Sequence, residues 1–91
     1  MGKAKLITYD LIKPETDYLD LIAEIKKYSD WCKIQKSVWI VSTNDNCITI
    51  RDHLKSNMDD DDRLFVAALS GETAWIKSIC KDEEAKRVIT A

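Results

Sequence analysis

Two amphipathic helical patterns, each set between segments of strand-like composition, most constrain how this chain folds. The first has the i, i+3, i+4, i+7 spacing of one helical face and comprises Tyr18, Leu21, Ile22 and Ile25, extended by Tyr28. The second has the same period and comprises Cys47, Ile50, Leu54 and Met58. Strands that alternate with helices predict a mixed α and β domain rather than an all-helical or all-β one.

Polar residues mark where each predicted helix begins. We expect Thr16 or Asp17 to cap the first helix and the polar cluster at 44–46 to cap the second. Pro14 favours a turn or the first turn of a helix just before the first of these caps. The acidic run at 59–62 ends the second helix and begins a loop.

Segments rich in β-branched and aromatic residues predict the strands that come before the first helix and after the second. Lys5–Asp10 is the first, and the nearly continuous apolar run Leu64–Leu69 is typical of a central strand that is covered on both faces. After a turn at residues 70–71, Thr73–Ile79 has the composition of a short edge strand. Lys81–Ile89 then reads as a terminal helix with Asp82 as its cap.

Between the two helices, the β-type segment Trp31–Thr43 is longer than a usual strand. We interpret it as two strands, Trp31–Gln35 and Ser37–Thr43, with a sharp turn or bulge near Lys36. A single bent strand is the alternative.

The order strand, helix, strand, strand, helix, strand is that of a ferredoxin-like βαββαβ domain of the α+β class, followed here by a short C-terminal strand and helix. Its one antiparallel sheet carries the first two helices on the same face. A chain of 91 residues has the length of a single domain.

The second face of that sheet needs a cover. If Trp39 and the residues of its alternation parity lie there, they form an apolar patch, and monomers rarely expose large ones. A second copy of the chain is the simplest cover. We therefore expect a homodimer with Trp39 at or near its interface.

The charge balance narrows the function classes. With a net charge of −2, the chain lacks the basic excess of a dedicated nucleic-acid-binding protein, although a local basic patch or a metal-bridged phosphate contact remains compatible with it. The longest apolar run, Leu64–Leu69, is far shorter than the ~20 residues that span a bilayer. We expect a cytoplasmic protein with no membrane partner.

The three cysteines, Cys32, Cys47 and Cys80, are widely spaced, and no Cys-x-x-Cys pair or Cys/His cluster accompanies them. This spacing gives no support to zinc or thioredoxin-like chemistry. We expect three reduced, half-buried thiols, as is usual in the cytosol.

Three stretches carry a resemblance to a known family. Leu6–Leu11 is a hydrophobic strand that ends in Tyr-Asp-apolar, Ile34–Trp39 reads IQKSVW, and Asp62–Val66 places an acidic residue before an apolar strand. In this order and spacing, residues 4–69 resemble the small CRISPR-associated endonucleases, the lesser partner of the spacer-integration enzyme, and their stand-alone relatives. Trp39 stands where that family usually has Phe, and lysines replace its arginines, which favours a stand-alone relative.

The resemblance implies a dimer in which the Asp10 carboxylates of two chains face each other and hold a divalent cation, Mg²⁺ or Mn²⁺. Mg²⁺ is satisfied by one or two carboxylates and several waters, and such a metal would serve cleavage of RNA or DNA phosphodiesters. Tyr9 and Trp39 would lie at the dimer interface, and a spacer integrase would be a partner only if encoded nearby. In the alternative reading, Asp10 ends the strand and caps the following loop, and the dimer is a non-catalytic scaffold or binding module.

Several other polar or aromatic residues have two readings. Lys33, Lys36 and Ser37 are candidates for contact with a nucleic acid, whereas Ser37 and Gln35 also suit a turn. Trp39 is able to stack on a base, but packing in an interface is the plainer role.

His53 is the single histidine and has no Asp–Ser or Cys partner at the spacing of a triad, so we expect a solvated surface side chain. The acidic run at 59–62 lacks the Gly and the Glu that an EF-hand loop needs. We expect it to be a solvated loop.

Overall fold

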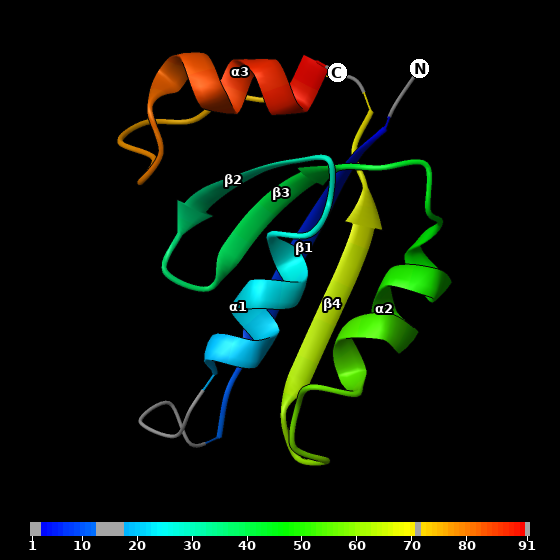
Figure 1. Cartoon of the computed structure of the whole chain (residues 1–91). Coiled ribbons are helices and arrows are strands. Elements are labelled where there is room, and N and C mark those ends of the chain that lie inside the picture. The colour runs from blue at the N-terminus through cyan, green and yellow to red at the C-terminus, as the bar shows by residue number, and fades with distance from the viewer. Residues whose placement is uncertain (1–2, 13–17, 71, 91) are drawn as a thin grey trace.

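The computed structural model describes residues 3–12, 18–70 and 72–90. This part of the chain is a mixed α+β domain with one antiparallel four-stranded sheet and three helices. In chain order the elements are β1 (Ala4–Asp10), α1 (Leu19–Ile25), β2 (Asp30–Gln35), β3 (Val38–Ser42), α2 (Cys47–Lys55), β4 (Arg63–Ala68) and α3 (Asp82–Thr90) (Figure 1). The predicted alternation of strands and helices is confirmed over β1 to β4.

The strands lie in the order β2-β3-β1-β4, and every neighbouring pair is antiparallel. The prediction that Leu64–Leu69 forms a central strand is wrong, because β4 lies at the edge of the sheet with β1 beside it. The apolar side chains of β4 divide between the two faces. Leu64 and Val66 pack against the main core, whereas Phe65 is 61% exposed.

β2 and β3 form a hairpin with Lys36 and Ser37 at its turn, so the alternative of one bent strand is wrong. The register between the two strands shifts between Lys33 and Gln35. This is a bulge of the kind that the length of the Trp31–Thr43 segment suggested, and bulges bend a strand and increase its twist.

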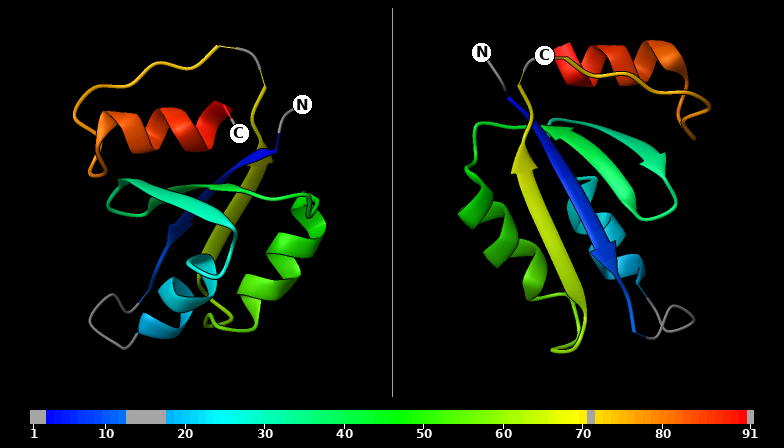
Figure 2. Two further views of the ribbon diagram at one scale, coloured as in Figure 1. Left: turned by 45° about the horizontal axis from the view of Figure 1, so that its top comes forward. Right: turned by 180° about the vertical axis from the view of Figure 1, so that it is seen from behind.

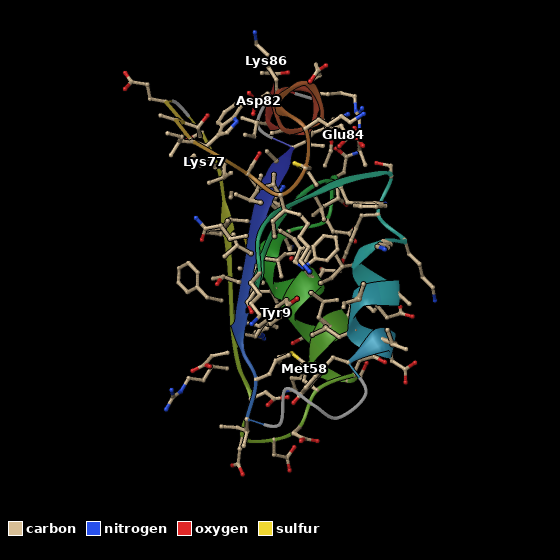
Figure 3. All side chains as sticks on the ribbon, turned by 90° about the vertical axis from the view of Figure 1, so that its left-hand side faces the viewer. Tyr9, Met58, Lys77, Asp82, Glu84 and Lys86 are labelled. Atoms are coloured by element: carbon tan, nitrogen blue, oxygen red, sulfur yellow. A yellow bond between two sulfur atoms is a disulfide. The ribbon has the colours of Figure 1, made fainter. Side chains whose placement is uncertain are left out.

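Helices α1 and α2 cover one face of the sheet, and Figure 3 shows both on the same side when the sheet is seen nearly edge-on. Together with β1 and β3 they enclose what we call the main core. Its buried residues are Ile7, Tyr9, Leu21, Ile25, Trp39, Val41, Ile50 and Leu54. The two helical patterns therefore point inward as predicted except at Cys47, which is half-buried and outside this core, and Met58 lies beyond the end of α2 and packs partly against the core.

Trp39 lies on this helix-covered face, which corrects the prediction that it lies on the opposite one. The side chain is 2% exposed and sits in the main core. Alternation along β3 separates Trp39 and Val41 from Ile40, which faces the other way. Because both sets are apolar, the sequence pattern alone does not say which set faces the helices.

The second face is covered at one end by α3, a helix of the same chain. Both views of Figure 2 place α3 at the end of the sheet where β1 begins, away from α1 and α2. Here a second cluster forms from small and medium side chains: Ala4, Cys32, Ile40, Ala85 and Val88. The prediction overlooked that the terminal helix of this chain supplies part of the cover.

The predicted start of the first helix falls outside the described residues, since Pro14, Thr16 and Asp17 are not among them. The cap of α2 is confirmed. Asn46 has an extended backbone, and its Oδ1 accepts a hydrogen bond from the backbone N–H of Thr49 at 2.8 Å.

The segment that precedes α3 is irregular, so the prediction of an edge strand at Thr73–Ile79 is wrong. Lys77 has a φ of 56°, in the left-handed region that does not continue a strand. Only after this residue do the backbone N–H groups of Ile79 and Cys80 bond to the carbonyls of Ile34 and Lys33, each at 3.0 Å.

The terminal helix is confirmed, but Asp82 does not cap it. At its N-terminus, Glu84 Oε1 accepts a bond from the backbone N–H of Lys81 at 3.2 Å. Asp82 lies inside the first turn, and its Oδ1 accepts the indole N–H of Trp75 at 3.3 Å instead.

Cys32 and Cys80 form a disulfide, so the expectation of three reduced thiols is wrong for this pair. The fold brings the segment before α3 against β2 and closes a separation of 48 residues that sequence spacing does not reveal. Cys47 is free and half-buried. Among the described helices, none has the length and apolar character needed to cross a membrane.

Candidate functional site

Asp10 is the last residue of β1 and pairs in register with Arg63, the first residue of β4. Arg63 Nη1 lies 3.2 Å from Asp10 Oδ2, and the two side chains are 79% and 68% exposed. Salt screens such a pair and water solvates it, so it contributes little to stability. The Asp10 carboxylate is therefore accessible to another cation or another molecule.

None of the helices among the described residues covers the sheet face beside Asp10. Ala4 and Leu6 belong to the second cluster, so alternation along β1 directs Thr8 and Asp10 to the same face. In Figure 3, α3 lies at the other end of that face. A hollow of about 190 Å³ opens here, lined by Thr8, Tyr9, Asp10, Arg63, Leu64 and Phe65. We call this region the open end of the sheet.

Tyr9 borders the hollow at the open end, but its side chain, like that of Trp39, is buried on the other face of the sheet. They face the main core, where the Trp39 indole N–H donates a hydrogen bond to the Tyr9 hydroxyl at 3.0 Å. Both side chains are buried by packing within one chain. This corrects the placement of Trp39 on an uncovered face and leaves neither residue as surface for a second copy.

The turn between β2 and β3 lies next to the end of β1. The backbone N–H of Tyr9 donates to the Ser37 carbonyl at 3.2 Å, and Lys36 at the same turn is exposed. Lys33, in contrast, lies on the helix side, with its Nζ 5.5 Å from the centre of the Trp39 ring. The structure thus brings Lys36 and Ser37 near Asp10 but separates Lys33 from them.

His53 is not a freely solvated side chain, which corrects that expectation. Its Nε2 lies 2.5 Å from Glu24 Oε1, and its Nδ1 lies 3.3 Å from the Tyr28 hydroxyl. These contacts join α2 to α1 and to the turn that follows it. The signal was absent from the sequence, because Glu24 and His53 are 29 residues apart and meet only when the two helices pack.

Charge neighbours shift the acid–base equilibria of this cluster. Hydrogen bonds from Lys27 first, and then from His53, lower the pKa of Glu24. Burial is the main cause that raises the pKa of the Tyr28 hydroxyl, with Asp45 and Glu24 adding to it. The cluster thus joins the two helices through the contacts of His53 with Glu24 and Tyr28.

The acidic run at 59–62 also has a structural role that the solvated-loop reading missed. Asp62 Oδ1 accepts the backbone N–H of Ile12 at 2.8 Å, and Oδ2 accepts that of Asp59 at 2.9 Å. One carboxylate thereby fastens the loop after β1 to the turn before β4. The resemblance singled out Asp62 for its place before the last main strand. The two hydrogen bonds of its carboxylate give this position a structural role.

The donor set for a divalent cation is incomplete in one chain. Within residues 3–12, 18–70 and 72–90, no three metal-ligating side chains gather. Asp10 offers a carboxylate, the ligand type that Mg²⁺ prefers, but its neighbour is the Arg63 guanidinium rather than a second oxygen. A site with two Asp10 carboxylates would need a second copy of the chain, and Arg63 would have to turn away from Asp10.

No protein-family model matches this chain, and no solved structure matches it significantly.

Proposed function

We propose that this chain is a homodimeric ferredoxin-like module that joins two Asp10 carboxylates and cleaves RNA or DNA phosphodiesters with Mg²⁺ or Mn²⁺. The support for the fold is the strand order, which reads β4-β1-β3-β2 from its other edge, combined with the βαββαβ order of the elements. The support for the activity is the resemblance of residues 4–69 to the small CRISPR-associated endonucleases.

One observation carries the proposal: Asp10 is exposed at the end of the sheet that none of the described helices covers. A second copy that packs there brings one carboxylate from each chain to the same interface. Phe65 is 61% exposed on β4 beside Asp10, and it offers an apolar contact that water does not favour.

The two Asp10 side chains would hold the cation, and bound Mg²⁺ or Mn²⁺ would stabilise charge on the phosphoryl oxygens or activate a water. Arg63 would give up Asp10 and become free to contact phosphate. Lys36 and Ser37 lie beside the end of β1 and would contact the nucleic-acid backbone. With so few cations, we expect binding to weaken with salt by a log–log slope of magnitude below roughly 4.

The second candidate is a non-catalytic scaffold or binding module with the same fold, and the Asp10–Arg63 ion pair favours it. In this case the guanidinium already satisfies the carboxylate and no cation is needed. For either candidate we place the protein in the cytoplasm, and a spacer integrase would be its partner only if encoded nearby.

The deciding experiment compares wild type with Asp10→Asn, and with Asp61→Asn as a matched control. Asp61 is exposed in the loop before β4, so its substitution changes the charge equally away from the open end. Thermal melting is followed in EDTA and in Mn²⁺, and cleavage of labelled RNA and DNA is assayed in parallel.

The nuclease proposal predicts Mn²⁺ stabilisation and cleavage in wild type and Asp61→Asn, and neither in Asp10→Asn. Without metal, Asp10→Asn should melt at the same temperature or higher, because two facing carboxylates repel. If Mn²⁺ shifts no melting curve and Asp10→Asn melts lower, the ion pair is structural and the scaffold candidate replaces the nuclease.

A further inference from the structure

The C-terminal segment that ends in α3 packs on β1, β2 and β3 at one end of the second sheet face. Its helix adds the small side chains of Ala85 and Val88 to the second cluster. The main core, in contrast, is filled by Trp, Tyr, Leu and Ile side chains. The residues that lead into α3 form no regular structure, and Ile76 is 83% exposed there.

Three ties fasten this segment to β2. Arg87 donates two hydrogen bonds to the Asp30 carboxylate at 2.8 and 2.9 Å. The backbone N–H groups of Ile79 and Cys80 bond to β2 carbonyls at 3.0 Å. The third tie is the Cys32–Cys80 disulfide, which is covalent and, along β2, lies between the residues that form the other two.

We propose that the Cys32–Cys80 pair is a redox latch that keeps α3 docked on the sheet when oxidised and lets it leave when reduced. This inference rests on the geometry of the C-terminal segment and not on the proposed nuclease activity. The cross-link keeps the C-terminal segment and β2 at high local concentration, so the non-covalent contacts between them stay formed. Without it, those contacts must hold the segment unaided.

The reaction needs a dithiol reductant, of the small-molecule or protein kind. Cys80 is half-buried and Cys32 is 1% exposed, so a thiolate of the reductant reaches Cys80 Sγ first. It forms a mixed disulfide there and expels the Cys32 thiolate, which takes up a proton. The second thiol of the reductant then attacks its own sulfur in the mixed disulfide, releases Cys80 and leaves as a cyclic disulfide. Two electrons and two protons reach the protein.

Departure of α3 uncovers apolar surface. Ala4, Cys32 and Ile40 are 1%, 1% and 6% exposed beneath Ala85 and Val88 and would then face water. In the reducing cytosol, disulfides in most organisms are transient and report redox state. The latch therefore couples the redox state of the surroundings to the exposure of one end of the second sheet face.

The test is hydrogen exchange with mass spectrometry on the whole chain, oxidised with glutathione disulfide and then reduced with dithiothreitol. Backbone amides of α3 should exchange at least about tenfold faster after reduction, because a lost cross-link shifts local opening by about that much or more. Amides of α2, on the opposite face, should not change and serve as the internal reference.

Cys80→Ser should exchange in α3 like the reduced wild type even under oxidant, whereas the matched control Cys47→Ser should keep the redox response. Comparison of the two redox forms of the wild type needs no substitution, so a poorly folded variant leaves the test intact. Equal α3 exchange in both forms, or peptide mapping that finds no Cys32–Cys80 linkage after oxidation, would overturn the latch.

Discussion

Arg87 and Asp30 lie 57 residues apart in the sequence and are joined by two parallel hydrogen bonds, from Nε to Oδ2 and from Nη2 to Oδ1. One residue comes from α3 and the other begins β2, so this pair ties the terminal helix to the edge strand of the sheet. Bidentate pairs of this geometry are the strong members of their class.

This pair predicts a pH-dependent part of the stability. The hydrogen bonds from Arg87 are the main cause that lowers the pKa of Asp30. A carboxyl with a lowered pKa in the folded state stabilises the fold at pH values above its unfolded pKa, and that contribution disappears as the pH falls through the folded pKa. Asp30→Asn should therefore be less stable than wild type at neutral pH and equally stable in acid.

Denaturant unfolding of wild type, Asp30→Asn and the control Asp61→Asn across this pH range measures the effect. A difference between wild type and Asp30→Asn that persists unchanged at the most acid pH would contradict the ionic origin of the tie.

The buried hydrogen bond between the Trp39 indole and the Tyr9 hydroxyl predicts a loss of unfolding free energy when either side chain is replaced. Tyr9→Phe removes the acceptor and leaves the Trp39 indole N–H buried without a partner, which costs about 1–3 kcal/mol of unfolding free energy. In a double-mutant cycle with Trp39→Phe, the second substitution should cost less in the Tyr9→Phe background, since the hydrogen bond is already gone. Additive losses would show that the two side chains do not interact.

How far the sequence predicts this structure depends on the distance along the chain over which each signal acts. The strands β1 to β3 and the helix α2 follow from alternation, periodicity and a cap within a few residues, and these predictions are confirmed. The face that holds Trp39 was predicted wrongly, because both sides of β3 are apolar and only the packing of α1, α2 and α3 separates them.

Contacts between distant segments could not be predicted from the sequence for the same reason. Cys32 and Cys80 have no spacing motif, and their 48-residue separation closes only because α3 returns to β2. Asp62 reaches Ile12 across 50 residues, although its place before the last strand marked it as notable. Asp10 was found from a motif, but its neighbour Arg63 required the register between β1 and β4.

The cluster of Glu24, Lys27 and His53 predicts which substitution changes the pKa of Glu24 more. Because the hydrogen bond from Lys27 is the largest cause of the lowered Glu24 pKa, Lys27→Met should raise that pKa more than His53→Gln does. Side-chain carboxyl titration by NMR measures the pKa in the three proteins. A larger rise in His53→Gln would reverse the assignment and make the contact between α1 and α2 the dominant one.

Phe65 tests whether the open end of the sheet meets a second copy. The side chain is already 61% exposed, so Phe65→Ser should change the unfolding free energy of the isolated chain by no more than about 0.5 kcal/mol. If two copies pack there, the substitution should nevertheless weaken their association, because apolar groups at the centre of an interface carry much of its binding energy.

Light scattering over a range of micromolar concentrations should find a wild-type dimer that becomes a monomer in Phe65→Ser. Ile76→Ser is the matched control, since Ile76 is equally apolar and 83% exposed but lies in the segment before α3. A wild-type mass near 10.5 kDa at every concentration would remove the dimer, and with it any cation site built from two Asp10 side chains.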